Sequence, residues 1–339
     1  MPDREMAPKP TVHKSFDVEK DLVDMKGKVV IVTGGNTGIG FETVKQLLRA
    51  KTSRVYLAAR NEGRATEAID ALKAEGLVIA GESEVRWHKL DLGDPKGAKA
   101  SAEDFLKKEE RLDVLINNAA DMYSSDIGQY GVSNMHIVNY ISPYIFTKTL
   151  LPLLKKTALE PDSDVRIVNV TSQMYARVPT PVSYKTLEDF NIKYSWRPAS
   201  NLVRYANSKL AMNLWSRHLQ TQLIASESSG NGVTVLALHP GVVTSYEMPL
   251  PCLQGPINNL MRALLKAVEP EVGCRTSVFA AAAKQVRDER ERYQAVGGVY
   301  LEDLPVPGTV VEMTATAKDD QLKEDLIATT EQFLKELGL

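Results

Sequence analysis

The sequence contains little cysteine: its 339 residues include only Cys252 and Cys274. Two thiols at this spacing match neither a metal site nor a disulfide framework, so we expect no structural disulfide and a reducing compartment. No stretch approaches the ~18 apolar residues that span a bilayer, and the charged N-terminus lacks the apolar core of a secretory signal. These absences predict a cytoplasmic protein without a transmembrane segment or a metal.

A strong excess of charge of either sign is also missing. The chain has 41 Lys and Arg residues against 43 Asp and Glu residues, a formal net charge of −2, and no long basic run. Proteins that grip nucleic acid need a basic patch or stripe, so this composition argues against nucleic acid as a partner. With 43% hydrophobic residues the chain can bury a sizeable core.

Short β-branched runs alternate with longer helix-compatible patterns from Lys28 onward, which indicates βαβ units and a parallel sheet. The expected strands are 28–33, 54–59, 84–90, 114–117, 165–170, 233–238 and 298–301. The expected helices are 41–49, 63–74, 96–108, 134–155, 204–224 and 272–286. We therefore predict an α/β fold in which residues 27–339 form a single doubly wound, Rossmann-type domain with a seven-stranded parallel sheet. Residues 1–26 are expected to be a disordered or loosely docked tail.

Two segments, 175–202 and 248–270, break this alternation. Both follow strands, at the carboxyl edge where open α/β sheets bind ligands. The second segment has an apolar stripe at helical spacing, made by Leu253, Ile257, Leu260, Met261, Leu264, Leu265 and Val268. It predicts either a surface helix packed on the core or a helical insertion that covers the substrate, and we weigh the two equally. A helix resting on a membrane ranks third, because its polar face offers only Arg262 and Lys266.

A glycine-rich turn, TGGNTGIG at residues 33–40, follows the first strand and precedes a helical pattern. Glycines make such a turn tight and let backbone N–H groups approach a pyrophosphate at the positive end of a helix. Glycines also mark ordinary turns, but here strand, turn and helix come in the required order. The residues expected to contact the dinucleotide are Gly34, Asn36, Thr37, Gly38, Ile39 and Gly40.

Further motifs follow in a fixed order: Asp91-Leu92, NNAA at 117–120, VTS at 170–172 and YANSK at 205–209. From about Lys28 to Leu301 the chain resembles the short-chain dehydrogenase/reductase family, particularly its retinol-dehydrogenase-like members. The resemblance implies that Asp91 and Leu92 contact the adenine and that Asn118 supports the wall facing the ribose. Asp91 could equally be a helix N-cap.

Tyr205 and Lys209 are four residues apart in a helical segment and therefore share one face. Reducing a carbonyl requires an acid that protonates the developing alkoxide, and a free tyrosine with a pKa of ~10 is a weak one. A neighbouring ammonium stabilises the phenolate and lowers that pKa. Such a pair is usually only a solvated helix face, but its position in the motif order predicts catalysis, with Tyr205 as acid/base.

The resemblance supplies the remaining site residues. Ser172 matches the serine that orients the substrate oxygen, with Thr171 beside it, and Asn139 matches the asparagine that completes a proton relay, with Asn134 nearby as a second candidate. Either asparagine could be helix surface or a cap. The sequence HPGVVTS at 239–245 resembles a loop that contacts the nicotinamide, which predicts roles for Val243 and Ser245, or for Thr244 if the loop shifts by one residue. We expect His239 to be a packed loop residue.

The end of the second strand predicts the choice of cofactor. Proteins that prefer NAD place an acidic residue there, and that carboxylate would repel a 2′-phosphate. Ala59 occupies the position, and Arg60 and Arg64 follow with guanidinium groups suited to phosphate. We therefore expect NADP(H), although an arginine at a strand end often only reaches into solvent.

Together these features predict an NADP(H)-dependent oxidoreductase that interconverts a carbonyl and an alcohol on a small apolar substrate. The substrate class is inferred from aromatic and apolar residues of the two irregular segments, namely Tyr175, Tyr184, Phe190, Trp196, Tyr246, Met248 and Met261. Retinoids, steroids, fatty aldehydes and ketones of secondary metabolism all stay open, as does a homodimer. The main alternative is a catalytically silent NADP-binding sensor or scaffold; an epimerase or dehydratase ranks lower.

Overall fold

The computed structural model describes residues 15–197, 199–226, 232–243 and 267–339. Its centre is one eight-stranded sheet in the order β3-β2-β1-β4-β5-β6-β7-β8. The strands are β1 (Val29–Thr33), β2 (Arg54–Ala59), β3 (Glu84–Lys89), β4 (Val114–Asn117), β5 (Val165–Val170), β6 (Val233–Leu238), β7 (Val299–Glu302) and β8 (Thr309–Val311). The seven predicted strands are all parallel, which confirms the doubly wound α/β fold.

The strand count was wrong by one, because β8 runs antiparallel to β7 at the edge of the sheet. It has only three residues, too few for a period-2 pattern to be visible in the sequence.

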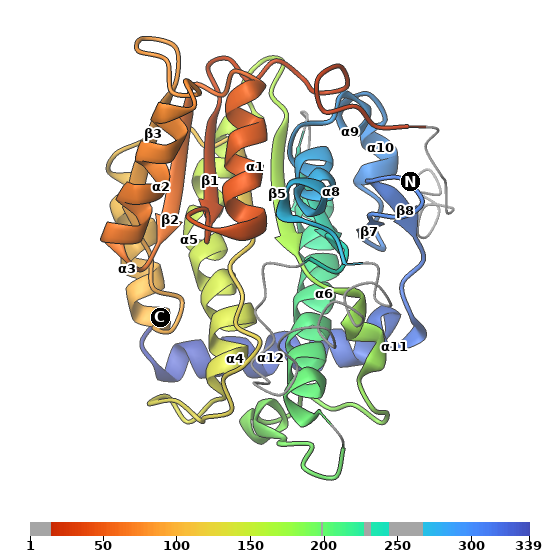
Figure 1. Cartoon of the computed structure of the whole chain (residues 1–339). Helices are drawn as coiled ribbons and strands as arrows, with labels where there is room; N and C mark the ends of the chain where they lie inside the picture. The colour runs from red at the N-terminus through yellow and green to blue at the C-terminus, as the bar shows by residue number, and fades with distance from the viewer. Residues whose placement is uncertain (1–14, 198, 227–231, 244–266) are drawn as a thin grey trace, which may run out of the picture.

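Helices cover both faces of the sheet (Figure 1). One face carries α1 (Gly38–Arg49), α2 (Glu62–Ala74) and α8 (Pro270–Ala282), followed by the short α9 (Lys284–Asp288) and α10 (Arg290–Tyr293). The other carries α3 (Pro95–Leu106), α5 (Ser142–Ala158) and α6 (Ser200–Ser226). Because both faces are covered, the central strands are continuous apolar runs with every residue of β1, β5 and β6 buried.

The helix expected at 134–155 is interrupted. It consists of α4 (Asn134–His136), a π-helical turn (Ile137–Ile141) and α5. A π turn has one extra residue per turn and often occurs at functional sites. Here it contains Asn139.

The end of the chain adds α11 (Ala315–Lys318) and α12 (Asp320–Glu336), which the strand and helix predictions did not include. Helix α12 lies on the face of the sheet that also carries α3, α5 and α6. It runs across α6 and packs on it (Figure 1). Leu326 and Leu334 on α12 are at most 1% exposed, and the Tyr140 and Thr330 hydroxyls are 2.8 Å apart. The C-terminal helix is therefore an integral part of the core.

The described part of the N-terminal tail is docked on the domain. Backbone N–H groups of Val23 and Lys284 donate to the carbonyls of Ala282 and Asp21, at 2.8 Å each. The Phe16 ring lies edge-on to Phe279 at 5.1 Å. The remainder of the tail, residues 1–14, lies outside the described residues.

The segment 175–202 contains two short 3₁₀ helices, Gln173–Arg177 and Leu187–Asn191. Tyr175, Tyr184 and Phe190 are at most 5% exposed and belong to the main hydrophobic core. Their aromatic content therefore reflects packing and gives no support for an apolar ligand. Most of the segment 248–270, with its apolar stripe, lies outside the described residues, so all three of its interpretations stay open.

Candidate functional site

The predicted site residues follow β1, β4, β5 and β6, whose carboxyl ends meet at one edge of the sheet. Helix α6, which carries the predicted catalytic pair, approaches the same edge and packs against the 3₁₀ helix that Ser172 begins. The topology thus brings the predicted nucleotide-binding turn and the predicted catalytic side chains together.

The turn after β1 requires its glycines. Gly34 and Gly38 have φ angles of +66° and +54°, a region that favours glycine. A Cβ on Gly40 would lie 2.3 Å from the carbonyl oxygen of Gly34 and 2.6 Å from Nδ2 of Asn118. Thr37, the N-cap of α1, makes no side-chain capping bond. The first backbone N–H groups of α1 can therefore serve an anion such as a pyrophosphate.

Asn118 closes the wall beside this turn. Its side chain donates to the carbonyl oxygen of Thr33 at 2.9 Å, and the Thr33 hydroxyl accepts from the backbone N–H groups of Asn118 and Ala119. Asp91 accepts from the N–H of Gly93 at 2.9 Å, in a local turn after β3, and Leu92 is 7% exposed. Asp91 is therefore not an N-cap: Asp94 caps α3 instead.

Lys209 is buried beside Tyr205. Its Nζ lies 5.5 Å from the centre of the Tyr205 ring and donates to the carbonyl oxygen of Val170 at 2.8 Å. Lys209 is 1% exposed and Tyr205 5%. Because burial disfavours the charged form, the pKa of Lys209 falls to about 7. A small environmental change can therefore alter the charge beside the tyrosine near neutral pH.

Asn139 is fixed by three hydrogen bonds. Its Oδ1 accepts from the backbone N–H of Asp121 at 2.6 Å, and its Nδ2 donates to the Asp121 carbonyl at 2.7 Å and to the Ser208 hydroxyl at 2.9 Å. Ser208 in turn donates to the carbonyl of Tyr205 at 2.8 Å. This network connects the π turn to α6, and it distinguishes Asn139 from Asn134. The sequence analysis did not assign roles to Asp121 and Ser208, although Ser208 lies inside YANSK.

The two hydroxyls that follow β5 have different partners. Thr171 is 1% exposed and donates to the carbonyl of Leu238 at 3.0 Å, so its hydroxyl is used within the sheet. The Ser172 hydroxyl accepts a hydrogen bond from the N–H of Met174 at 3.2 Å, and this bond does not use the hydroxyl's own proton. Its hydroxyl can donate to a substrate oxygen, which favours Ser172 over Thr171.

Ala59 ends β2 and is 6% exposed, while Arg60 and Arg64 are exposed at the start of α2. Both residues follow the carboxyl end of β2, which pairs with β1, the strand that leads into the glycine turn.

The loop after β6 is described as far as Val243, which is 8% exposed and packs tightly against Gly273 of α8. Ser245 and the alternative Thr244 lie outside the described residues. His239 is buried, and burial lowers its pKa to about 4, so it is neutral at physiological pH. This is consistent with a packed residue.

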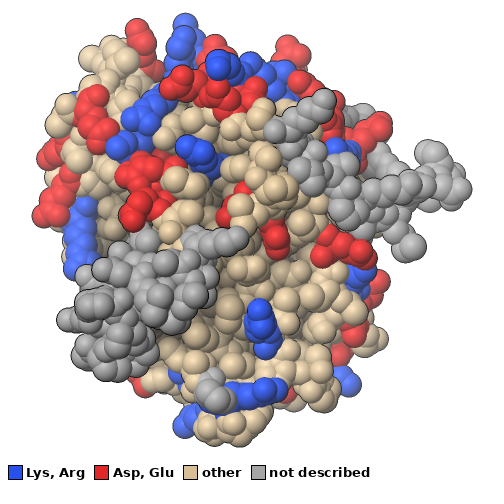
Figure 2. Space-filling model, turned by 45° about the vertical axis from the view of Figure 1, so that its right-hand side comes forward, with Lys and Arg blue, Asp and Glu red and all other residues tan. Residues whose placement is uncertain are grey.

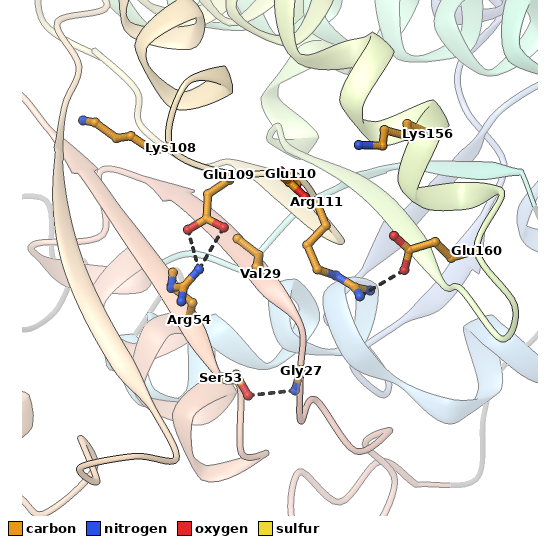
Figure 3. Close-up of a pocket in the computed structure, with 10 residues that line it drawn as sticks. All are labelled: Gly27, Val29, Ser53, Arg54, Lys108, Glu109, Glu110, Arg111, Lys156 and Glu160. Atoms are coloured by element: carbon orange, nitrogen blue, oxygen red, sulfur yellow. Dashed lines mark hydrogen bonds and ion pairs between the residues drawn. The ribbon is translucent and has the colours of Figure 1, made fainter.

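A depression at the opposite, amino edge of the sheet is lined by charged side chains, among them the ion pairs Arg54–Glu109 and Arg111–Glu160 (Figure 3). The Nη1 of Arg54 lies 2.6 and 2.8 Å from the two carboxylate oxygens of Glu109, and Nη1 of Arg111 lies 3.0 Å from Glu160. Since these charges neutralise each other, the depression is a structural ion-pair network, and the carboxyl edge is the candidate active site.

Comparison with known proteins agrees with this assignment. The family described as short chain dehydrogenase matches residues 28–185. A short-chain dehydrogenase/reductase of Armillaria gallica is 40% identical over 329 residues, covering 94% of this chain and 96% of that one. An NADPH-bound carbonyl reductase from chicken fatty liver is similar in fold, with a TM-score of 0.55 at 22% identity, covering 84% of this chain and 99% of that one.

A short chain dehydrogenase from Burkholderia cenocepacia, solved in complex with NADP, has a TM-score of 0.59 at 20% identity, covering 85% of this chain and 99% of that one. In the described residues, no helix is both long and apolar enough to cross a bilayer. The identity to the Armillaria protein along almost the whole chain establishes that this protein belongs to the short-chain dehydrogenase/reductase family of oxidoreductases.

Proposed function

We propose that this protein is an NADP(H)-dependent enzyme that interconverts a carbonyl and an alcohol on a small apolar molecule. The observation that carries the proposal is the buried pair of Tyr205 and Lys209, on the helix that packs against the carboxyl end of β5, in a chain whose turn after β1 has no room for a Cβ at Gly40. A buried amine of low pKa next to a phenol is costly for stability and has a direct use in proton transfer.

The residues at the carboxyl edge fit a dinucleotide. The N–H groups at the start of α1 would hold the pyrophosphate, Val243 would contact the nicotinamide, and Asp91 with Leu92 would contact the adenine. The cofactor, when bound, supplies or accepts a hydride. Exposed Arg60 and Arg64, together with Ala59 in place of a carboxylate, support NADP(H), as do the two similar structures that hold NADPH or NADP.

The protein's part in the reaction is proton transfer and orientation. Ser172 donates a hydrogen bond to the substrate oxygen and stabilises the negative charge that develops there. The Tyr205 hydroxyl donates its proton to the same oxygen during reduction and takes it back during oxidation. Lys209, when protonated, stabilises the phenolate that this transfer leaves. Asn139, fixed by Asp121 and Ser208, supports proton exchange with solvent at the base of the helix.

The small number of cysteines supports a cytoplasmic location. The apolar character of the substrate is inferred from the segment 248–270 and from the family resemblance.

Consumption of NADPH, followed by absorbance with a panel of apolar ketones and aldehydes, tests the proposal. Tyr205→Phe should lower turnover at least ~100-fold, the lower range of general acid catalysis, and leave NADPH binding unchanged because the ring stays. A silent NADP-binding protein would bind NADPH equally well in both forms and consume it in neither. Ordinary turnover by folded Tyr205→Phe would contradict the assigned role of the tyrosine.

A further inference from the structure

Trp196 is unusually exposed for a tryptophan, at 67% of its surface. It stands at the tip of a turn, closed by a 2.9 Å hydrogen bond from the N–H of Arg197 to the carbonyl of Tyr194. In Figure 1 this part of the chain is the green segment before α6, which projects beyond the carboxyl edge of the sheet. An indole in this position meets water and whatever approaches that edge.

The base of the turn is held firmly. Tyr194 is 4% exposed, has a φ of +51°, and accepts a 2.6 Å hydrogen bond from Nδ2 of Asn207. Asn207 belongs to α6, between the two catalytic residues of the YANSK motif. Tyr194 also contacts the Trp196 ring, at 5.5 Å between centroids. Trp196 is thus presented outward by an ordered base.

The turn is also basic. Lys193 and Arg197 are exposed, and Arg204 lies beside them, donating to the carbonyl of Lys193 at 3.5 Å. The sequence has no Asp or Glu between Phe190 and Arg204, although the whole chain carries a net charge of −2. In Figure 2, Lys and Arg side chains border this lower end of the molecule.

We propose that the turn 193–197 docks the protein reversibly on an anionic bilayer surface. Tryptophan prefers the headgroup level of a bilayer, and each basic residue near an anionic surface strengthens binding about fivefold at low salt. Three basic residues around one tryptophan are too small a footprint for nucleic acid, which is gripped by a longer stripe. Docking at this edge turns the candidate active site toward the bilayer, which dissolves apolar molecules. That last consequence rests on the proposed function, whereas the docking itself does not.

Binding of the full chain to vesicles tests the proposal. Co-sedimentation is measured in 50 mM NaCl with vesicles of phosphatidylcholine and phosphatidylserine (7:3) and with phosphatidylcholine alone. We expect binding to the mixed vesicles only, and its loss in 0.5 M NaCl, where surface charges are screened. Lys193→Gln and Arg197→Gln should each weaken binding about fivefold and the pair about 25-fold. Lys51→Gln, the same charge change at an exposed turn on the amino edge, is the matched control and should change nothing.

Fluorescence tests the position of the indole. The chain has three tryptophans, so emission is compared with that of Trp196→Phe. Brominated lipid in the mixed vesicles should quench the wild type, and Trp196→Phe should remove that quenching. The proposal would be overturned if Trp196→Ala and Arg197→Gln each bound vesicles as strongly as the wild type does, or if the wild type bound both vesicle types equally. Binding to heparin without binding to vesicles would also overturn it. NADPH binding, measured on the same preparations, reports separately on the proposed function and should not change in these variants.

Discussion

At the scale of single residues, Lys209 shows how burial creates a usable group. The sheet and α6 bury Nζ, which donates a hydrogen bond to the carbonyl of Val170. The amine therefore has little to stabilise its charge until a phenolate forms at Tyr205. The same burial that tunes the group makes the folded protein sensitive to pH.

We predict a specific pH dependence of stability from Lys209. Its pKa is about 7 in the folded protein against the ordinary lysine value of 10.5, so between these values the unfolded chain binds more protons. The free energy of unfolding should therefore rise with pH across this window, by at most ~1.4 kcal/mol per pH unit, and the cost is complete below pH 7. Urea unfolding of wild type and Lys209→Met from pH 6.5 to 9.5 checks this. The variant should gain most stability at the acidic end, and a difference that is independent of pH would contradict the depressed pKa.

The cofactor preference is a second prediction at this scale. A hydrogen bond to a charged group contributes ~1.5–3 kcal/mol, so Arg60 alone could favour NADPH over NADH by roughly 10- to 150-fold in Kd. We expect Arg60→Ala to weaken NADPH binding alone and Ala59→Asp to reverse the preference. Titration with both cofactors measures this. If Arg60→Ala lost affinity for NADH equally, the arginine would be stacking on the adenine or supporting the fold.

At the scale of elements, the buried strands were predictable because each is a short apolar run between turn residues. The bounds of β2, β4, β5 and β6 match the expected ones. The motif order also predicted Ser172, Tyr205 and the glycine turn as site residues, and the parallel strands bring them to one edge of the sheet. Elements that depend on partners distant in sequence were not predictable: β8 needs β7 beside it, and α12 needs the exposed side of α6. Likewise, nothing in the sequence spacing indicates that Ser208 orients Asn139 through a π turn.

The glycine turn gives a prediction for an element. In Gly40→Ala the new methyl would overlap the Gly34 carbonyl, since non-bonded atoms prefer ~3.5–4.0 Å. The turn must open, and we expect NADPH affinity to fall at least ~10-fold. Gly63→Ala on α2 is the matched control: its Cβ would meet its nearest atom at 3.4 Å, and alanine favours a helix by up to ~1 kcal/mol. Fluorescence titration with NADPH, alongside thermal unfolding, separates the two. Equal NADPH affinity in Gly40→Ala and wild type would show that the turn does not bind the cofactor closely.

At the scale of the whole molecule, one sheet joins every layer. The glycine turn and α1 lie on one face, α6 and α12 lie on the other, and the hydrophobic clusters on both faces share the strands between them. A ligand bound at the carboxyl edge contacts loops from both halves of this sheet. A ligand bound at this edge should therefore also stabilise α12 against unfolding, although that helix lies away from the glycine turn.

We accordingly predict that NADPH raises the unfolding temperature of the whole domain in one step. At 100 times its Kd a ligand adds ~2.7 kcal/mol, and with an unfolding entropy of ~2.1 cal/mol/K per residue this shifts the midpoint by about 4 °C. Far-UV circular dichroism should report the same shift as Trp215, which is 3% exposed on α6 and lies 5.4 Å from the ring of Tyr144. Its emission can be isolated in a Trp87→Phe/Trp196→Phe background. A Trp215 transition that NADPH left in place while the circular dichroism transition moved would mean that the α6–α12 layer unfolds as a separate unit.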